Sequence, residues 1–227
     1  MSQDDRLVVP PRAVLWDMDG TLLDSAEHHW ATWSEAFRGA GFDLTREQFD
    51  AAFGRRNDDW LRDYLGAAAL EAVATVSNAK EELYRTFVRT HGVEPLPGVR
   101  RWLAELKKQD WRQVVASSAP KLNIEAVLAA LDVDHYFEAI VASEDVARGK
   151  PEPDVFLMAA ELVGVPPDRC VVVEDAPAGI EAAHRAGMRA LGVGRSYAVL
   201  PAERVVATLD DLEPDAFDRL LRSSRPA

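Results

Sequence analysis

Short apolar runs recur along the chain, and each of them stops at a polar turn. The runs that we interpret as strands span residues 14–16, 114–116, 140–142 and 171–173, with a last strand near residues 205–206. Continuous apolar runs of this kind, bounded by turn-forming residues, are typical of strands that are buried on both faces. The pattern therefore predicts a sheet that is covered by other elements on both sides.

Helical spacing of apolar residues fills the segments between these strands. The helices that it predicts span residues 99–107, 122–131, 154–162 and 178–186, followed by an amphipathic C-terminal helix that carries Phe217 and Leu220. Strands that alternate with helices form parallel sheets with right-handed crossovers. We therefore predict an α/β protein with a Rossmann-like parallel sheet.

Residues 25–94 break the alternation of strands and helices. Trp30, Trp33 and Phe37 follow helical spacing there, and no strand-like run is present. We predict a helical insert over 25–94, and an α/β core domain that comprises residues 1–24 and 95–227. We interpret the tryptophans of the insert, Trp60 included, as core packing.

Composition limits the classes of function that are open to the chain. With 48% hydrophobic and 28% charged residues, the 227-residue chain can bury a full core. The formal charge of -12 argues against binding to nucleic acid or to an anionic membrane surface, which requires clustered Lys and Arg. A polar start at residues 1–6, a single cysteine, Cys170, and the lack of a long apolar run lead us to expect a cytoplasmic protein. We also expect a monomer, although no sequence pattern determines the oligomeric state.

Polar residues follow the predicted strands directly. They are Asp17 and Asp19 after the first strand, Ser117 after the second, and Glu174 and Asp175 after the fourth, while Lys150 lies a few residues beyond the third. In an open parallel sheet the carboxyl ends of the strands meet at one edge, and ligands bind in the crevice there. We therefore expect these six side chains to lie close together.

Four carboxylates at one edge repel one another strongly unless a cation is present. A hard ion with oxygen ligands and open coordination positions is best matched by Mg²⁺. A metal beside a lysine and a serine hydroxyl suits phosphoryl transfer, in which an aspartate can act as nucleophile and a second carboxylate as general acid and base. An Asp-x-Asp-Gly turn alone is more often structural, so the prediction depends on the combination.

These residues resemble the haloacid dehalogenase superfamily, in particular its phosphatases and phosphomutases with a helical cap. Residues 17–25, Asp-Met-Asp-Gly-Thr-Leu-Leu-Asp-Ser, are similar to the first motif of the family, and Ser117 to the second. Lys150, within Gly-Lys-Pro-Glu-Pro-Asp, is similar to the third, and Glu174-Asp175 to the fourth. The likeness covers essentially the whole chain and is weakest in the insert.

The resemblance implies a role for each core residue. Asp17 would be the nucleophile, and Asp19 the acid and base that also lends its backbone carbonyl to the metal. Ser117 and Lys150 would hold the phosphate, and Glu174 and Asp175 would complete a Mg²⁺ site together with Asp17. The insert would be a mobile cap. Further substrate-binding candidates are Gly20, Thr21, Ser118, His29, Arg55, Arg56 and Lys80.

The activity that this resemblance implies is a Mg²⁺-dependent phosphatase of small organic phosphate monoesters, acting through an aspartyl-phosphate. His29 and Lys80 resemble residues of the β-phosphoglucomutases, so a phosphomutase is the alternative. The mutases carry an arginine in the cap loop that holds the distal phosphate. Our alignment places Asn57 at that position, and an alignment shifted by one residue places Arg56 there. For Arg55 and Arg56 the other interpretation is a solvated turn. A non-catalytic phosphate-sensing domain is the third hypothesis.

Overall fold

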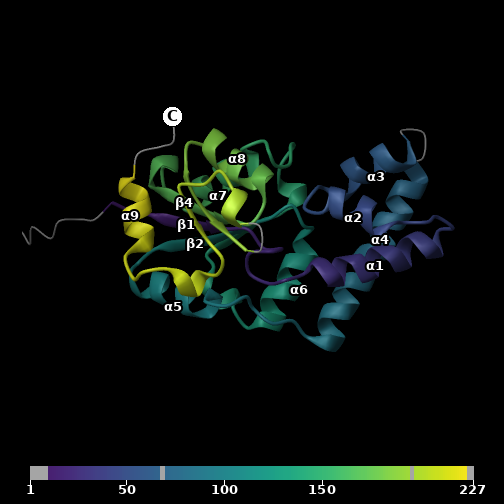
Figure 1. The fold of residues 1–227 in the computed structure, drawn as a ribbon, viewed down its shortest axis with the longest axis horizontal. Coiled ribbons are helices and arrows are strands. Elements are labelled where there is room, and N and C mark those ends of the chain that lie inside the picture. The colour runs from purple at the N-terminus through teal and green to yellow at the C-terminus, as the bar shows by residue number, and fades with distance from the viewer. Residues whose placement is uncertain (1–9, 67–69, 195–196, 224–227) are drawn as a thin grey trace, which may run out of the picture.

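The computed structural model describes residues 10–66, 70–194 and 197–223, so the polar start of the chain lies outside the described residues. Its centre is a six-stranded parallel sheet with the strand order β3-β2-β1-β4-β5-β6, which confirms the α/β fold (Figure 1). The strands are β1 (Ala13–Trp16), β2 (Arg112–Ala116), β3 (Ala139–Val141), β4 (Cys170–Glu174), β5 (Arg189–Val193) and β6 (Arg204–Val206).

Helices cover both faces of this sheet. The predicted helices correspond to α5 (Val99–Lys108), α6 (Lys121–Leu131), α7 (Asp154–Leu162), α8 (Pro177–Arg185) and α9 (Ala216–Arg222). Alternate residues of β1 face opposite sides: Val14 and Trp16 pack with α5, α6 and α9, while Ala13 and Leu15 pack with α7 and α8. This period of two is the geometry of a strand that is buried on both faces.

The sequence pattern did not predict β5. This strand contains Ala190 and Gly192, and glycine is depleted in strands. A Cβ on Gly192 would lie 2.9 Å from Leu200 Cδ1, so close packing explains the small residue. Short 3₁₀ turns connect the other elements: η1 (Asp134–Tyr136), η2 (Ser143–Asp145), η3 (Pro167–Arg169), η4 (Tyr197–Val199) and η5 (Leu209–Asp211).

Among the described residues, four helices lie between β1 and α5, the helix that leads back to the sheet. They are α1 (Ala26–Gly39), α2 (Arg46–Ala52), α3 (Asn57–Leu65) and α4 (Leu70–His91), and they gather at one end of the molecule (Figure 1). They share an apolar cluster in which the rings of Trp33 and Trp60 meet edge to face with centroids 4.7 Å apart. The cluster confirms the packing interpretation of these tryptophans. Among the described residues, no helix has the length and the apolar character needed to cross a membrane.

The two segments that join these helices to the sheet lie side by side. Leu23 and Pro95 form an antiparallel bridge, and the Leu96 N–H donates to the Leu22 carbonyl at 2.9 Å. Helix α4 also packs against α6. The helical segment is therefore attached beside the carboxyl end of β1, where the first motif lies.

Candidate active site

A lysine whose side chain is only 6% exposed, Lys150, joins two carboxylates at the centre of the sheet edge. Strands β1 and β4 are neighbours, so Asp17 and Glu174 emerge side by side at their carboxyl ends. Lys150 Nζ donates to Asp17 Oδ1 at 2.6 Å and to Glu174 Oε1 at 2.8 Å. Asp17 is only 7% exposed, and its N–H donates to the Val173 carbonyl at 3.0 Å. The structure therefore brings the first, third and fourth motifs into contact.

Burial and mutual repulsion dominate the electrostatics of this group. Burial raises the pKa of Asp17 to about 7, with Lys150 opposing the change and Glu174 adding to it. Burial followed by the carboxylates of Glu174 and Asp17 raises the pKa of Asp175 to about 9. Burial alone would lower the pKa of Lys150, but Asp17 and Glu174 outweigh it and raise that pKa. Lys150 is therefore a permanent cation that only partly offsets the acidic cluster.

Two glycines make room for the acidic side chains. A Cβ on Gly179 of α8 would lie 1.7 Å from Glu174 Oε1, and a Cβ on Gly20 would lie 2.0 Å from Asp175 Oδ2. Glu174 is also fixed by the Ala176 N–H, which donates to its Oε2 at 2.7 Å. Gly20 of the first motif and Gly179 of α8 are therefore required by the position of the carboxylates.

We expect Gly20→Ala to destabilise the protein by more than about 1 kcal/mol, because alanine at a positive φ is strained and its methyl group meets Asp175. Gly20 has a φ of 85°. Gly41→Ala is the matched control, since Gly41 has a φ of 79° with nothing within 4 Å of a Cβ. Urea unfolding measures both variants. Equal destabilisation would show that the contact with Asp175 adds nothing to the backbone strain.

The donor set at this edge fits a hard divalent cation. Carboxylate oxygens of Asp17, Glu174 and Asp175 lie within 4.8 Å of one another. Three carboxylates face a single ammonium group there, and the raised pKa of Asp175 reflects this excess of negative charge. Oxygen-only donors favour magnesium, calcium or manganese over zinc. The Asp19 carboxylate lies outside this group. If Asp19 binds the metal, as the resemblance implies, it must do so through its backbone carbonyl.

A cavity of about 110 Å³ opens beside these carboxylates. It is lined by Asp17, Asp19, Ser117, Ser118, Lys150, Glu174 and Asp175, together with Phe53, Gly54 and Arg55 of the helical segment. Ser117 is buried, and its Oγ accepts from the Ala119 N–H at 3.1 Å, which fixes the turn after β2. The cavity therefore combines one lysine, two serines and the acidic group.

Asp19 belongs to a second set of contacts, directed toward the helical segment. Its Oδ1 accepts from Ser25 Oγ at 2.6 Å and lies 3.0 Å from His29 Nε2. Burial works to raise the pKa of Asp19, but His29, Ser25 and Lys80 together lower it. The His29 ring stacks on Tyr84 with centroids 4.2 Å apart. The packing of His29 thus sets the direction of the Asp19 carboxylate.

A second cavity, of about 60 Å³, continues from the first between the helical segment and the turn after β2. The two cavities share Asp19, Phe53, Gly54, Arg55 and Ser118. Its other lining residues include the predicted His29 and Lys80, the aromatic rings of Trp33, Phe49 and Trp60, and the polar side chains of Asn57, Glu81 and Asn123. A substrate whose phosphate occupied the first cavity would place its leaving group in the second.

A family model described as haloacid dehalogenase-like hydrolase matches residues 11–187, most of the chain. The chain belongs to the haloacid dehalogenase-like hydrolases. The match confirms the resemblance stated from the four motifs, and it makes the protein an enzyme of this hydrolase family.

Relatives of this hydrolase include both phosphomutases and phosphatases. The beta-phosphoglucomutase of Bacillus subtilis (strain 168) is 34% identical over 217 residues, which cover 88% of this chain and 91% of that protein. The fructose-1-phosphate phosphatase YqaB of Escherichia coli (strain K12) is 36% identical over 188 residues, covering 79% and 95%. The solved beta-phosphoglucomutase of Clostridium difficile has a TM-score of 0.82 at 25% identity, covering 93% and 97%.

Three predicted binding residues of this hydrolase, Arg55, Arg56 and Gly20, have other contacts in the structure, and the side chain of a fourth, Thr21, is buried away from the cavities. Arg56 Nη1 donates to the Ala147 carbonyl at 3.2 Å, and Arg55 Nη2 donates to Asp63 at 2.6 Å. Thr21 is fully buried with no partner for its hydroxyl, and the Gly20 N–H donates to the Leu23 carbonyl at 2.8 Å. Among these four, only Arg55 lines the cavities.

Sequence reasoning missed several residues of the hydrolase's cavities. Ser25 holds Asp19, Phe53 lines both cavities, and Glu81 and Asn123 meet at the wall of the second. Ser25 lies in the first motif, and Glu81 directly follows Lys80. Their positions beside predicted site residues could have identified both of them from the sequence. Asn123 carries no signal in the sequence, because its contact with Glu81 depends on how α4 packs against α6.

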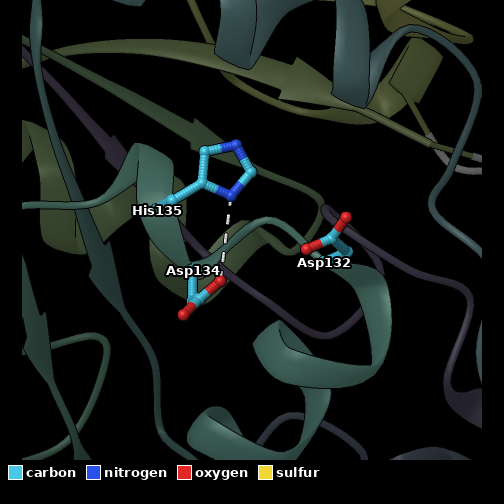
Figure 2. A group of neighbouring side chains, drawn as sticks. All are labelled: Asp132, Asp134 and His135. Carbon is cyan, nitrogen blue, oxygen red and sulfur yellow. Dashed lines mark ion pairs between the residues drawn. The ribbon is translucent and has the colours of Figure 1, made fainter.

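A second acidic group of the hydrolase lies on the surface near the end of α6. It consists of Asp132, Asp134 and His135, all exposed, and the His135 ring is turned toward Asp134 (Figure 2). His135 Nδ1 and Asp134 Oδ1 are 3.8 Å apart. Exposed side chains of this kind are ordinarily solvated, so we assign this group no metal.

Proposed function

We propose that this enzyme is a Mg²⁺-dependent phosphatase of small organic phosphate monoesters, sugar phosphates among them, and that it acts through an aspartyl-phosphate on Asp17. The observation that carries the proposal is the buried Asp17 carboxylate, held 2.6 Å from Lys150 Nζ in a cavity that also contains Ser117 and the acidic group. The single cysteine, which is buried and free, fits a reducing cytoplasm.

In the first chemical step, an Asp17 oxygen attacks phosphorus and the bond to the leaving-group oxygen breaks. Asp19 donates a proton to that oxygen, because an alkoxide is a poor leaving group. Since the pKa of Asp19 is lowered before substrate binds, this carboxylate must take up the proton when the substrate enters. In the second step, Asp19 accepts a proton from the water that attacks the aspartyl-phosphate, and phosphate leaves with Asp17 regenerated. Lys150 and Ser117 hold the phosphoryl oxygens, and Ser25 and His29 orient Asp19.

Asp17, Glu174, Asp175 and the backbone carbonyl of Asp19 would hold the metal. When bound, Mg²⁺ supplies positive charge that offsets the charge on the phosphoryl oxygens and on the carboxylates. The oxygen-only donor set and its excess of negative charge support this assignment.

The helical segment, residues 25–94, would act as a mobile cap over the site. Both cavities are lined by residues of this segment and of the sheet edge, so its movement would open and close them. The two connecting segments lie side by side at Leu23 and Pro95, and a small rotation there would move the whole segment. Closure would exclude bulk water while the phosphoryl group is transferred.

Phosphatase activity is favoured over phosphomutase activity by the contacts of the cap loop. A mutase must bind a bisphosphate in two orientations, which needs a cation for the distal phosphate. Arg55 is paired with Asp63, and Arg56 donates to the carbonyls of Val146 and Ala147. Asn57, which our alignment places at the arginine of the mutases, donates to Glu81.

An assay with β-glucose 1-phosphate and a catalytic amount of glucose 1,6-bisphosphate separates the two activities. A second arm with fructose 1-phosphate tests the substrate of the Escherichia coli relative, fructose-1-phosphate phosphatase YqaB. We expect release of inorganic phosphate without glucose 6-phosphate. Formation of glucose 6-phosphate in excess of phosphate would overturn the phosphatase proposal in favour of the mutase. No reaction with a broad panel of phosphate esters would favour a phosphate-sensing domain.

We expect chelation with EDTA to abolish turnover and added Mg²⁺ to restore it, because the acidic group lacks sufficient positive charge of its own. The apparent pKa of Asp175, about 9 without a cation, also predicts that Mg²⁺ binding releases protons near neutral pH. Phosphate release and proton release in weakly buffered solution measure the two effects. Full activity in EDTA would contradict the metal assignment.

A further inference from the structure

A buried ion pair that the proposed chemistry does not use lies in the wall of the second cavity. Lys80 Nζ is 2.9 Å from Glu81 Oε1, and the two residues are 2% and 6% exposed. The Glu81 carboxylate also accepts from the side-chain amides of Asn57 and Asn123. Donors from α3, α4 and α6 therefore fix this carboxylate at the boundary between the cap and the sheet domain.

Each basic side chain that lines this cavity, among the residues that the structure describes, already has an acidic partner. Lys80 is paired with Glu81, Arg55 with Asp63, and His29 lies 3.0 Å from Asp19 Oδ1. A leaving group that carried a carboxylate or a second phosphate would meet Glu81 without an unpaired cation to offset its charge. Burying an unpaired charge beside one of the same sign is strongly unfavourable.

Uncharged hydroxyl groups, in contrast, match this wall. A carboxylate has about four lone-pair positions. Lys80, Asn57 and Asn123 donate to Glu81, which leaves capacity for one more donor. The aromatic rings of the cavity cover the apolar faces of a carbon chain, and a few polar groups then set its orientation.

We propose that Glu81 determines the selectivity for the leaving group: the second cavity accepts phosphate esters of uncharged, hydroxyl-bearing alcohols and rejects esters whose leaving group carries a carboxylate or second phosphate. This inference rests on the proposed phosphatase function. Glu81 is thus a specificity residue for the reaction. Because Lys80 is already paired with it, the Glu81 carboxylate repels an anionic leaving group.

Two esters of the same carbon skeleton test the proposal. Glycerol 3-phosphate and 3-phosphoglycerate differ in one position, which is a hydroxymethyl group in the first and a carboxylate in the second. The selectivity is the ratio of kcat/KM for glycerol 3-phosphate to that for 3-phosphoglycerate. We expect the wild type to prefer glycerol 3-phosphate, and Glu81→Gln to lower the ratio about tenfold or more, because Lys80 is then unpaired.

The matched control is Glu82→Gln, the next residue of α4. Its side chain is 65% exposed and pairs with Arg85 and Arg89 outside the cavity, so we expect an unchanged ratio. Lys80→Met should change the selectivity in the opposite direction. It leaves the Glu81 carboxylate without its cation, so the ratio of the two kcat/KM values should rise. This second variant also keeps the test decisive if Glu81→Gln does not fold.

A purely structural role for Glu81 would slow both esters equally in Glu81→Gln and in Lys80→Met, and that result would overturn the inference. So would a wild type that prefers 3-phosphoglycerate. p-Nitrophenyl phosphate serves as the reference substrate for the chemistry itself. If the enzyme hydrolyses this ester but neither variant changes the selectivity ratio, only the role of Glu81 is overturned. If the enzyme hydrolyses none of the esters, the proposed function and this inference are overturned together.

Discussion

Asp17→Asn is expected to lower kcat on the order of 10⁴-fold or more, the scale seen when a catalytic nucleophile is removed. An amide oxygen is a poor nucleophile toward phosphorus, and asparagine keeps the shape of the side chain. The contact with Lys150 at 2.6 Å shows how closely the carboxylate is positioned. Steady-state phosphate release from p-nitrophenyl phosphate and a sugar phosphate measures the loss.

The control for this variant is Asp50→Asn, on the exposed surface of α2, which pairs only with Arg46 among the described residues. It removes the same charge from a side chain that lines neither cavity, and its kcat should equal that of the wild type. Circular dichroism and thermal unfolding show whether Asp17→Asn has kept the fold. A folded Asp17→Asn enzyme with undiminished turnover would rule out the covalent role of Asp17.

Asp19→Asn is expected to lower kcat for alkyl phosphates by about 10²- to 10⁴-fold, the usual contribution of a general acid and base. The effect should depend on the leaving group. A sugar alkoxide needs a proton from Asp19, whereas p-nitrophenolate leaves without one. With p-nitrophenyl phosphate we therefore expect a rapid burst of p-nitrophenolate followed by slow turnover, because only the second step then lacks its base.

Stopped-flow absorbance measures this burst, and its amplitude should approach one p-nitrophenolate for each active site. Ser25→Ala is the comparison variant, since Ser25 donates to Asp19 at 2.6 Å without being a proton donor to the substrate in our scheme. It should lose far less activity than Asp19→Asn. An equal loss for sugar phosphate and p-nitrophenyl phosphate in the burst phase of Asp19→Asn would contradict the role of Asp19 as acid.

The sheet edge could be predicted from the sequence because short-range patterns determine it. Apolar runs that stop at Asp17, Ser117 and Glu174 identify strand ends, and parallel strands bring their carboxyl ends together. The structure places these residues around one cavity, joined by Lys150 from the loop after β3. The position of Lys150 followed from its distance along the chain and from the family resemblance.

The wall of the second cavity could not be predicted in the same way. Glu81, Asn57 and Asn123 meet because three helices pack at particular angles, and helix periodicity specifies a buried face without specifying its neighbour. Arg56 illustrates the same limit. The sequence leaves a phosphate clamp and a solvated turn open for Arg56, and its contacts with the backbone carbonyls of Val146 and Ala147 depend on the fold.

The covalent intermediate can be observed directly in Asp19→Asn, where its hydrolysis should be slow. The enzyme is mixed with ³²P-labelled p-nitrophenyl phosphate and Mg²⁺, quenched in acid within the burst phase, and digested for peptide mapping. We predict near-stoichiometric label on the peptide that contains Asp17, released by hydroxylamine as expected for an acyl phosphate. Label on another peptide, or a full burst with no labelled protein, would contradict phosphoryl transfer to Asp17.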